Sequence, residues 1–395
     1  MRDETLSRTL ERYESAPHLV FWEVTKACSL ACRHCRASAQ PVGLPGELTT
    51  AEGRALLDEI ARFVPSPIVV LTGGDCLERG DVFELIDHAR ALGLRVGVAP
   101  SVTDRLNRAT LARLHSLGVR ALSISLDGAG PESHDGLRGV AGHFERTLVA
   151  IREAVEMGFR VQVNTTVTRD NAAELADVVA RVRDLGVMIW EVFFLVGVGR
   201  GDAVAEVSAH DAEDVAHFLV DVAGLGLTVR TVEAPLFRRV QAERELLGDD
   251  DPRGAFSLGA LYDALRARLD LVAPAPTRRS STSLATGDGR GVIFVGHDGA
   301  VHASGFLPLD LGNVRRDRLG DVYAGDALLA SMRSGELEGV CGACAYRRLC
   351  GGSRARAFSH TGRATASDPL CVKVAGGDAP EVEAANALAA RAHAV

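Results

Sequence analysis

Apolar segments of strand type alternate with amphipathic segments of helix type along the first half of the chain. The strand-type segments lie at 19–24, 68–72, 95–99, 121–126, 160–167 and 187–196, and helix-type segments lie at 52–63, 81–92, 107–117, 143–157, 172–185 and 211–223. Continuous apolar strands separated by helices form a parallel sheet covered by helices. A doubly wound sheet would carry a glycine-rich phosphate loop after its first strand, and cysteines stand there instead. We therefore predict an α/β fold with a partial (β/α)6 barrel of the TIM type.

The cysteines after the first strand are Cys28, Cys32 and Cys35, with the spacing C-x3-C-x2-C. Barrel chemistry takes place at the C-terminal ends of the strands, where this loop lies. Three thiolates hold three irons of a cubane cluster, whereas a closed cluster needs four. The remaining iron would be open to a ligand, as catalysis at a metal requires. Zinc is an alternative, although it usually takes two C-x2-C pairs or cysteine with histidine. Three buried thiols are the other alternative.

The wording of this loop resembles a known family. Phe-Trp-Glu-Val-Thr-Lys-Ala-Cys at 21–28 and Cys-Arg-His-Cys-Arg-Ala at 32–37 are similar to the radical S-adenosylmethionine (SAM) superfamily. Within that superfamily they resemble the branch related to haem biosynthesis, which carries a C-terminal SPASM extension. The resemblance implies an enzyme whose [4Fe–4S] cluster binds SAM and cleaves it reductively. The product is a 5′-deoxyadenosyl radical that removes hydrogen from a substrate. A low-potential electron donor of the flavodoxin or ferredoxin type is also implied.

The second strand ends in Gly73-Gly74-Asp75, followed by Cys76. Two glycines allow a ligand to approach the backbone closely, and the carbonyls and the carboxylate can take an ammonium group. By itself the motif is also typical of a tight turn. The resembled family has Gly-Gly-Glu/Asp-Pro here, which holds the SAM amino group, so Cys76 replaces the usual proline. We interpret Cys76 as a buried thiol, with a redox or hydrogen-donor role and cluster ligation as alternatives.

Further SAM contacts are expected at later strand ends, because barrels bind ligands there. By resemblance, Ser125 and Asp127 lie near the SAM carboxylate or ribose. Arg138 could pair with a carboxylate, although a surface arginine after a turn is the alternative. The remaining expected contacts are His34 stacking on the adenine, Asn164 and Thr166 at the ribose, and Val196 in the adenine-binding stretch 193–201.

A second cysteine group has the spacing C-x2-C-x5-C-x20-C, at Cys341, Cys344, Cys350 and Cys371. Four cysteines close a site, and by themselves they also fit a zinc ribbon. The group resembles a SPASM/Twitch auxiliary site, which implies a second [4Fe–4S] cluster. A full SPASM domain holds two auxiliary clusters, one with a cysteine in the preceding hairpin. The matching stretch 301–308 has no cysteine, so we predict one auxiliary cluster.

We divide the chain into a lead-in helix (1–17), a radical SAM core (18–226), an irregular linker (227–291) and a SPASM/Twitch-like domain (292–395). Within the linker, 227–232 could be another strand and 258–269 a helix. The next domain begins with a hairpin of the strands 292–295 and 300–302 around a turn at 296–299. The net charge of −8, without a basic run, argues against nucleic acid as a partner. No apolar run is long enough to span a membrane, and the polar N-terminus lacks an export signal. We therefore expect a cytoplasmic protein whose clustered cysteines bind metal rather than form disulfides.

The substrate depends on the resemblance alone. The haem-related branch implies a tetrapyrrole or haem precursor side chain, for which Arg200, Arg354 and Arg356 are candidate anchors. The alternative for each of them is a solvated arginine or one that stabilises a cluster. A peptide-modifying maturase is the alternative, followed by a sugar or aminocyclitol dehydrogenase. A two-cluster electron carrier and a zinc-stabilised binding protein are the non-enzymatic alternatives. The electron carrier would need neither Gly-Gly-Asp nor six strand–helix units.

Overall fold

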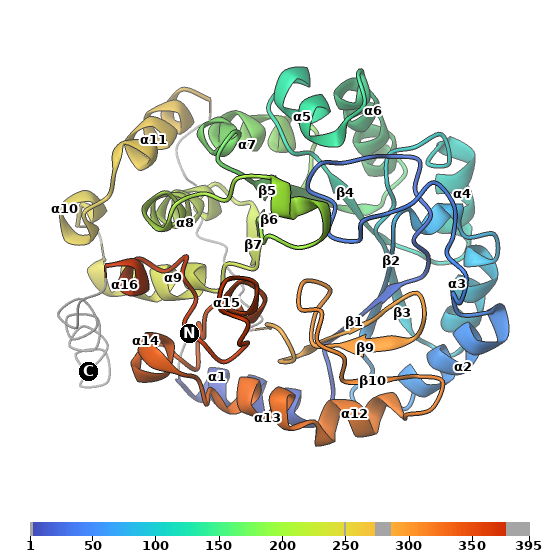
Figure 1. The fold of residues 1–395 in the computed structure, drawn as a ribbon. Helices are drawn as coiled ribbons and strands as arrows, with labels where there is room; N and C mark the ends of the chain where they lie inside the picture. The colour runs from blue at the N-terminus through green and yellow to red at the C-terminus, as the bar shows by residue number, and fades with distance from the viewer. Residues whose placement is uncertain (1–2, 249, 273–285, 377–395) are drawn as a thin grey trace.

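A computed structural model of the protein describes residues 3–248, 250–272 and 286–376. Its centre is a sheet with the strand order β10-β9-β8-β1-β2-β3-β4-β5-β6-β7, around which the helices are arranged (Figure 1). The strands are β1 (Leu19–Glu23), β2 (Ile68–Thr72), β3 (Arg95–Val98), β4 (Ala121–Ser125), β5 (Arg160–Val167), β6 (Ile189–Phe194), β7 (Thr228–Val232), β8 (Val292–Val295), β9 (Ala300–His302) and β10 (Gly312–Asn313). Neighbours from β8 through β1 to β7 are parallel. The predicted α/β partial barrel is confirmed.

Helices follow the strands in the order that the sequence predicts. They are α2 (Thr50–Ile60), α3 (Val82–Ala91), α4 (Arg108–Ser116), α5 (Pro131–Arg138), α6 (His143–Glu156), α7 (Leu175–Asp184) and α8 (Ala209–Ala223), after the N-terminal α1 (Asp3–Ser15). Short 3₁₀ turns are η1 (Cys76–Glu78), η2 (Ala172–Glu174) and η3 (Gly199–Ala203). The sequence analysis missed α5, although Pro131 in its first turn and left-handed Gly139 at its end are the usual boundary signals.

The segment 227–291 is more regular than we predicted. Strand β7 pairs in parallel with β6 and extends the sheet, and three helices follow it: α9 (Leu236–Leu247), α10 (Pro252–Phe256) and α11 (Ala260–Val272). Strand β7 and helix α11 confirm the strand and the helix that the sequence indicated here, whereas α9 and α10 were not indicated. Most of the rest of the segment, 273–285, lies outside the described residues.

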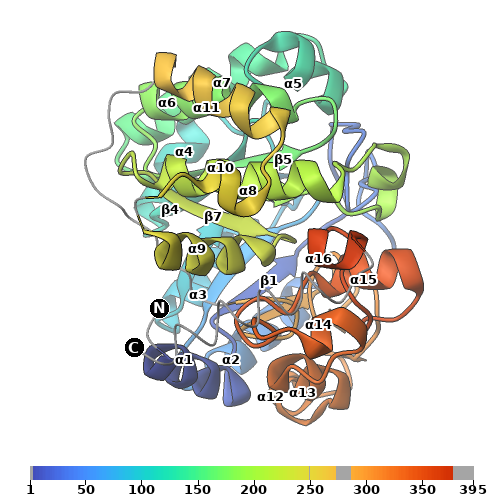
Figure 2. The same cartoon turned by 90° about the vertical axis from the view of Figure 1, so that its left-hand side faces the viewer.

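The C-terminal segment begins inside the main sheet, because β8 pairs in parallel with β1. Strands β8 and β9 then form the predicted antiparallel hairpin, and β10 adds to its edge. The helices that follow are α12 (Leu319–Gly325), α13 (Ala327–Ser334), α14 (Gly339–Ala343), α15 (Arg354–Thr361) and α16 (Val372–Ala375). Figure 2 shows α12 to α16 grouped together on one side of the sheet. The domain boundaries that we drew stay a prediction.

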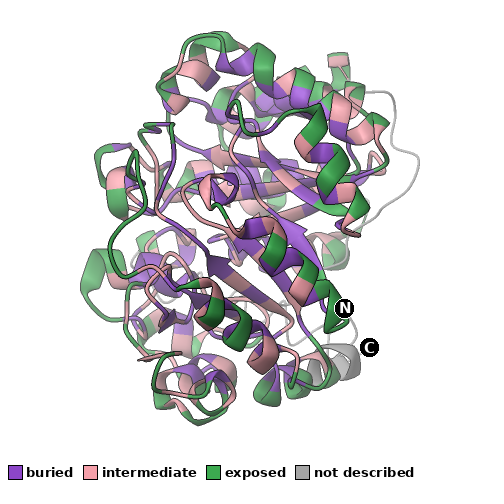
Figure 3. Ribbon diagram, turned by 90° about the vertical axis from the view of Figure 1, so that its right-hand side faces the viewer, coloured by how far each residue is buried: buried purple, intermediate pink, exposed green. Residues whose placement is uncertain are grey.

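The two faces of the sheet differ in character. Val20 and Trp22 are fully buried on the outer face, and Gly53 of α2 lets that helix lie close, because a Cβ there would meet the Trp22 ring at 2.7 Å. The inner face carries half-buried polar residues. The amide of Gln162 donates to Asn164 Oδ1 at 2.9 Å and to Glu191 Oε2 at 2.7 Å. The strands are mostly buried and the helices expose their outer sides (Figure 3).

Among the helices of the described residues, none combines the length and the apolar character that crossing a membrane requires.

Candidate active site

The cysteine loop leaves the C-terminal end of β1 and returns to it at Gln40. Its two ends are joined by hydrogen bonds from Cys28 N to Gln40 O (2.7 Å) and from Gln40 N to Lys26 O (2.9 Å). Cys28 and Cys32 are buried, and Cys35 is half-buried. The loop thus presents its three thiols at the end of the sheet where barrel chemistry occurs.

Each thiol sulfur of this loop receives a hydrogen-bond donor. The backbone N–H of Leu30 donates to Cys28 Sγ at 3.4 Å, and that of Ala39 donates to Cys35 Sγ at 3.5 Å. The guanidinium of Arg138 lies 3.7 Å from Cys32 Sγ. Donors of this kind favour the thiolate, which is the metal-binding form. Burial raises the pKa of Cys28, so its thiolate needs the positive charge of a metal centre.

The donor set fits an iron–sulfur cluster better than a single ion. Within the described ranges, no three side chains of His, Cys, Asp or Glu converge closely enough to hold one metal ion. Ligands of a cubane bind separate irons, so they need not converge on one point. Three buried polar atoms beside the loop also have no hydrogen-bond partner in the described part of the chain: His34 Nδ1, Arg138 Nε and Arg200 Nη2. A bound cofactor would satisfy such atoms.

Gly73 and Gly74 bring the end of β2 against the cysteine loop. Gly74 N donates to Thr25 O at 2.9 Å, and Asp75 N donates to Ala27 O at 2.7 Å. A Cβ on Gly73 would lie 2.6 Å from Thr25 O, and one on Gly74 would lie 2.7 Å from the Lys26 carbonyl. The glycines therefore permit a close approach between two backbone segments, in addition to any ligand.

The Asp75 side chain does not point to a ligand. Its carboxylate is fully buried and accepts hydrogen bonds from Thr103 Oγ1 (2.8 Å), Leu77 N (3.1 Å) and Ser101 N (3.3 Å). Burial also raises its pKa. The prediction that this carboxylate takes an ammonium is therefore wrong, because the side chain is spent on internal contacts. Carbonyl oxygens of the half-buried Gly73 and Gly74 remain for that role.

Ser101, which the sequence analysis missed, joins these two segments. Its Oγ lies 3.7 Å from Cys28 Sγ and donates to Gly74 O at 3.2 Å. It stands three residues after the end of β3. The strand-end rule that selected Ser125 would therefore have found it.

Asp127, at the end of β4, organises the opposite side of the loop. Its carboxylate accepts from the guanidinium of Arg138 and from Thr166 N (2.7 Å), and it lies 3.7 Å from His34 Nε2. Burial raises the pKa of Asp127, but the Arg138 charge and the histidines outweigh burial and lower it to about 2. Burial lowers the pKa of His34 to about 4, against the attraction of Asp127. The site thus holds an ionised carboxylate and a neutral imidazole at pH 7.

Two buried histidines, to which the sequence analysis gave no role, hold the backbone of Asp127 in place. Asp127 N donates to His134 Nδ1 at 3.0 Å, so His134 carries its proton on Nε2, which lies 2.8 Å from His143 Nδ1. His143 Nε2 then donates to Val102 O at 3.1 Å. Val102 directly follows Ser101, which contacts Cys28. At its other end the chain of hydrogen bonds begins at Asp127, which holds the Arg138 side chain beside Cys32. The chain therefore connects the surroundings of Cys32 with those of Cys28.

The remaining predicted SAM contacts lie on β4, β5 and the segment after β6. Ser125 and Asn164 are neighbours in the register of β4 and β5, and Val196 is buried. Arg200 donates to Cys32 O and Ala39 O, both at 2.9 Å. Arg200 therefore braces the cysteine loop, which is the cluster-stabilising role that we gave as the alternative to a substrate anchor.

The C-terminal cysteines show the same pattern of donors. Asp368 N, Tyr346 N and Gly352 N each lie 3.4 Å from a cysteine sulfur, those of Cys341, Cys344 and Cys350 respectively. Burial raises the pKa of Cys350 to about 12 and that of Cys371 to about 11. A metal charge is again what would hold these groups as thiolates.

Cys76 belongs to neither group. It is fully buried in the hydrophobic core, and burial raises its pKa well above the ordinary value. The thiol is thus protonated and enclosed, as the interpretation of a buried thiol requires.

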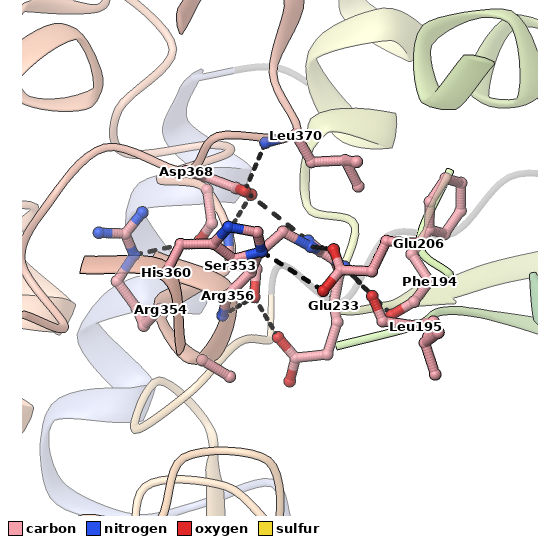
Figure 4. Close-up of polar contacts among 12 residues, drawn as sticks. Phe194, Leu195, Glu206, Glu233, Ser353, Arg354, Arg356, His360, Asp368 and Leu370 are labelled. Carbon is pink, nitrogen blue, oxygen red and sulfur yellow. Dashed lines mark hydrogen bonds and ion pairs between the residues drawn. The ribbon is translucent and has the colours of Figure 1, made fainter. Parts of the chain in front are cut away.

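Arg354 and Arg356 are not substrate anchors either. Arg354 is buried and donates to the carbonyls of Ala364 (3.0 Å) and Ala366 (2.6 Å). Arg356 is fully buried and donates to carbonyls at the ends of β6 and β7 (Figure 4). Both guanidinium groups donate to backbone carbonyls of the chain itself, so neither is directed at a ligand in the barrel mouth.

Comparisons with known proteins define the class. Residues 22–182 match the family model of the radical SAM superfamily. The fold resembles that of Streptococcus suis SuiB bound to S-adenosylmethionine (TM-score 0.65, 14% identity, 93% of this chain and 80% of that chain). It also resembles anSMEcpe with bound AdoMet (TM-score 0.63, 16% identity, 94% and 99%). The chain belongs to the radical SAM superfamily and is a radical SAM enzyme, which implies a [4Fe–4S] cluster and SAM.

Its relatives indicate which branch of the superfamily the chain is most similar to. The chain is 35% identical to the AdoMet-dependent heme synthase of Nitratidesulfovibrio vulgaris, over 92% of this chain and 94% of the relative. It is 34% identical to the enzyme of the same name from Methanosarcina barkeri (91% and 97%). It is 31% identical to the pre-heme d1 synthase of Dinoroseobacter shibae (89% and 85%). Within the superfamily, the chain therefore groups with proteins of haem biosynthesis.

Proposed function

We propose that this radical SAM enzyme modifies a side chain of a tetrapyrrole, with Cys28, Cys32 and Cys35 as the ligands of the SAM-binding cluster. When bound, the cluster supplies one electron to the S–C bond of SAM, and the resulting 5′-deoxyadenosyl radical removes a hydrogen atom from the substrate. A low-potential flavodoxin or ferredoxin would supply the electron in the cytoplasm. The observation that carries the assignment of the cluster ligands is the donor on each cysteine sulfur, next to three buried polar atoms that have no hydrogen-bond partner among the described residues. The tetrapyrrole is supported by the similarity to the AdoMet-dependent heme synthases.

The residues around the cysteine loop divide the binding of SAM among them. The carbonyls of Gly73 and Gly74 face the ammonium group, because the Asp75 carboxylate is enclosed. Arg138, held by Asp127, directs its remaining N–H at the SAM carboxylate. His34, neutral and half-buried, stacks on the adenine together with Val196. Ser125, Asn164 and Thr166, on β4 and β5, serve the ribose hydroxyls.

The C-terminal cysteines Cys341, Cys344, Cys350 and Cys371 hold one auxiliary [4Fe–4S] cluster in this proposal. Support comes from the backbone donors on three of their sulfurs and from their number, since four thiolates complete a cubane. A closed cluster suits electron transfer or bracing of the segment. Cys76 stays protonated in the core and takes no part.

Aromatic side chains support a flat conjugated substrate. Phe193, at the end of β6, and Phe306, after β9, lie with their ring centroids 6.2 Å apart. The guanidinium of Arg36 lies 4.8 Å from the Phe294 ring centroid and 5.9 Å from that of Phe306. Rings from the barrel and from the C-terminal segment thus come together beside the cysteine loop, where they would stack on a macrocycle.

The test is an anaerobic assay with the purified protein, SAM and dithionite. Iron and sulfide are counted first, and 5′-deoxyadenosine is then measured with and without an iron-containing or metal-free tetrapyrrole that bears propionate side chains. The proposal expects a faster release of 5′-deoxyadenosine and a changed mass of the tetrapyrrole. If only a peptide were modified and every tetrapyrrole were returned unchanged, the substrate proposal would be wrong.

A further inference from the structure

We propose that Arg356 is a positioning residue for SAM binding, and that it ties the adenine-binding end of β6 to the C-terminal cysteine site. The inference rests on the proposed function, because it takes Val196 as an adenine contact and Cys341 as a cluster ligand. It assigns to a buried arginine of the C-terminal segment a role in a site that lies on the barrel.

The guanidinium of Arg356 joins two strand ends. Its Nη2 atom donates to Leu195 O at 2.8 Å and to Phe194 O at 3.2 Å, where β6 ends. Its Nη1 atom donates to Glu233 O at 2.7 Å, directly after β7. Figure 4 shows these carbonyls converging on the one side chain. Backbone carbonyls at strand ends are where a barrel must be rigid to bind a ligand.

Glu206 is a second side chain that binds the segment after β6. Its Oε2 atom pairs with Arg356 Nε at 3.0 Å, and its Oε1 atom accepts from Gly197 N at 3.1 Å. Ser359 of α15 donates to Gly197 O at 2.9 Å. Val196 therefore lies between two anchored neighbours, Leu195 and Gly197, and both anchors involve α15. The position of this stretch depends on where the C-terminal helix lies.

A further chain of contacts leads from Arg356 to the cysteines. Arg356 N donates to Ser353 Oγ at 2.9 Å, and Ser353 N donates to Asp368 Oδ2 at 2.7 Å. Asp368 Oδ1 also lies 3.7 Å from Arg356 Nη1. The backbone N–H of Asp368 then donates to Cys341 Sγ at 3.4 Å. A change in the ligation of Cys341 thus moves groups that contact Arg356.

The planar fork of arginine is what this arrangement requires. Its N–H groups point in fixed directions and reach three carbonyls and a carboxylate together, whereas lysine carries a single compact ammonium that cannot span them. An Arg356→Lys substitution keeps the charge and releases the carbonyls of β6. We expect the SAM dissociation constant to rise about tenfold, in keeping with the loss of charge-assisted hydrogen bonds.

The experiment measures SAM binding to the anaerobically reconstituted full chain, together with iron content and thermal unfolding. Arg244→Lys is the matched control, because Arg244 pairs with Asp221 (2.7 Å) between α9 and α8. Among the described residues it makes no hydrogen bond or ion pair with the β6 segment. We expect Arg244→Lys to retain the wild-type SAM affinity even if it unfolds at a lower temperature. Unchanged SAM affinity in Arg356→Lys at full iron content would overturn the proposal.

A milder variant covers the case in which Arg356→Lys does not fold. Glu206→Gln keeps the shape and an acceptor oxygen for Gly197 but weakens the pairing with Arg356. We expect a rise of about threefold in the SAM dissociation constant. No change in that constant would overturn the proposal as well.

The connection to the cysteines is tested by a double-mutant cycle of Arg356→Lys with Cys341→Ala. If Arg356 transmits the effect, the double variant binds SAM no more weakly than the weaker single variant. Additive losses would overturn the connection. The iron content of the wild type is a separate readout. If it showed only one cluster, the proposed function would fail at the auxiliary site, whatever the SAM affinities were.

Discussion

The Nη1 atom of Arg138 lies 3.7 Å from the Sγ atom of Cys32, while its Nη2 atom pairs with the buried carboxylate of Asp127. One guanidinium thus connects the last residue of α5, the end of β4 and the cysteine loop. The pairing with Asp127 raises the pKa of Arg138 in spite of its burial, so the positive charge beside the sulfur is permanent.

This relationship predicts the effect of Arg138→Gln on the cluster. A permanent positive charge beside a ligand favours the reduced, more negative state, so its removal should lower the reduction potential of the first cluster. The expected shift is about 60 mV, since one charged hydrogen bond contributes about 1.4 kcal/mol in a one-electron couple. Spectroscopic redox titration measures it. Arg146→Gln is the control, because Arg146 pairs with Asp104 at the exposed surface. A potential equal to the wild type in Arg138→Gln would contradict the assignment.

The buried histidine pair predicts how stability depends on pH. Burial lowers the pKa of His134 to about 3 and that of His143 to about 4, whereas both titrate near 6.5 in the unfolded chain. As the pH falls from 6.5 towards 4, the unfolded chain binds protons that the folded protein refuses. The free energy of unfolding therefore falls, by about 2 kcal/mol for each histidine at pH 5.

Denaturant unfolding at pH 7 and pH 5, followed by tryptophan fluorescence, measures this loss. In His143→Gln the difference between the two pH values should shrink by about a third, because His134 and His34 still contribute. His210→Gln at the exposed surface should leave it unchanged. An equal difference in wild type and His143→Gln would rule out the histidine pair as its source.

Much of the site follows from the sequence because the motifs stand at strand ends. Cys28, Gly73 and Asp127 all follow apolar strands, and parallel strands bring their C-terminal ends to one edge. Side-chain direction does not follow in this way. The motif containing Asp75 does lie beside the cysteines, but the carboxylate turns inward to Thr103 and Ser101, which belong to another segment.

Gly74→Ala tests the close approach of β2 to the cysteine loop. The added Cβ would lie 2.7 Å from Lys26 O. Because both clashing segments are backbone, no side chain can rotate to remove the clash. We expect a loss of about 2 kcal/mol in the free energy of unfolding and poorer incorporation of the first cluster. Gly80→Ala is the control, since no described residue other than its chain neighbours lies within 4 Å of its Cβ position. Full iron content and wild-type stability in Gly74→Ala would show that the segments can separate without cost.

Cys76→Ala separates the buried thiol from the ligands. The side chain is fully enclosed by core residues, so its truncation should lower the free energy of unfolding by about 1 kcal/mol. Iron content and 5′-deoxyadenosine formation should stay at wild-type levels. Loss of one cluster's iron in this variant would instead make Cys76 a ligand.

The long-range contacts of the buried arginines could not be predicted from the sequence. Arg356 meets carbonyls of Phe194, Leu195 and Glu233, and neither spacing nor periodicity relates those positions. The pattern of 227–232 did indicate a strand, but not its partner: the parallel pairing with β6 places β7 in the sheet. Such features arise from packing between distant segments, where local pattern carries no signal.

The central claim is that an open iron of the first cluster binds SAM and leads to its cleavage. The most direct measurement compares 5′-deoxyadenosine formation by wild type and Cys28→Ala under dithionite, with the iron of the C-terminal site counted in both. We predict that wild type forms the product and that Cys28→Ala forms none while it retains the iron of the C-terminal site. Equal amounts of 5′-deoxyadenosine from both proteins would contradict the account.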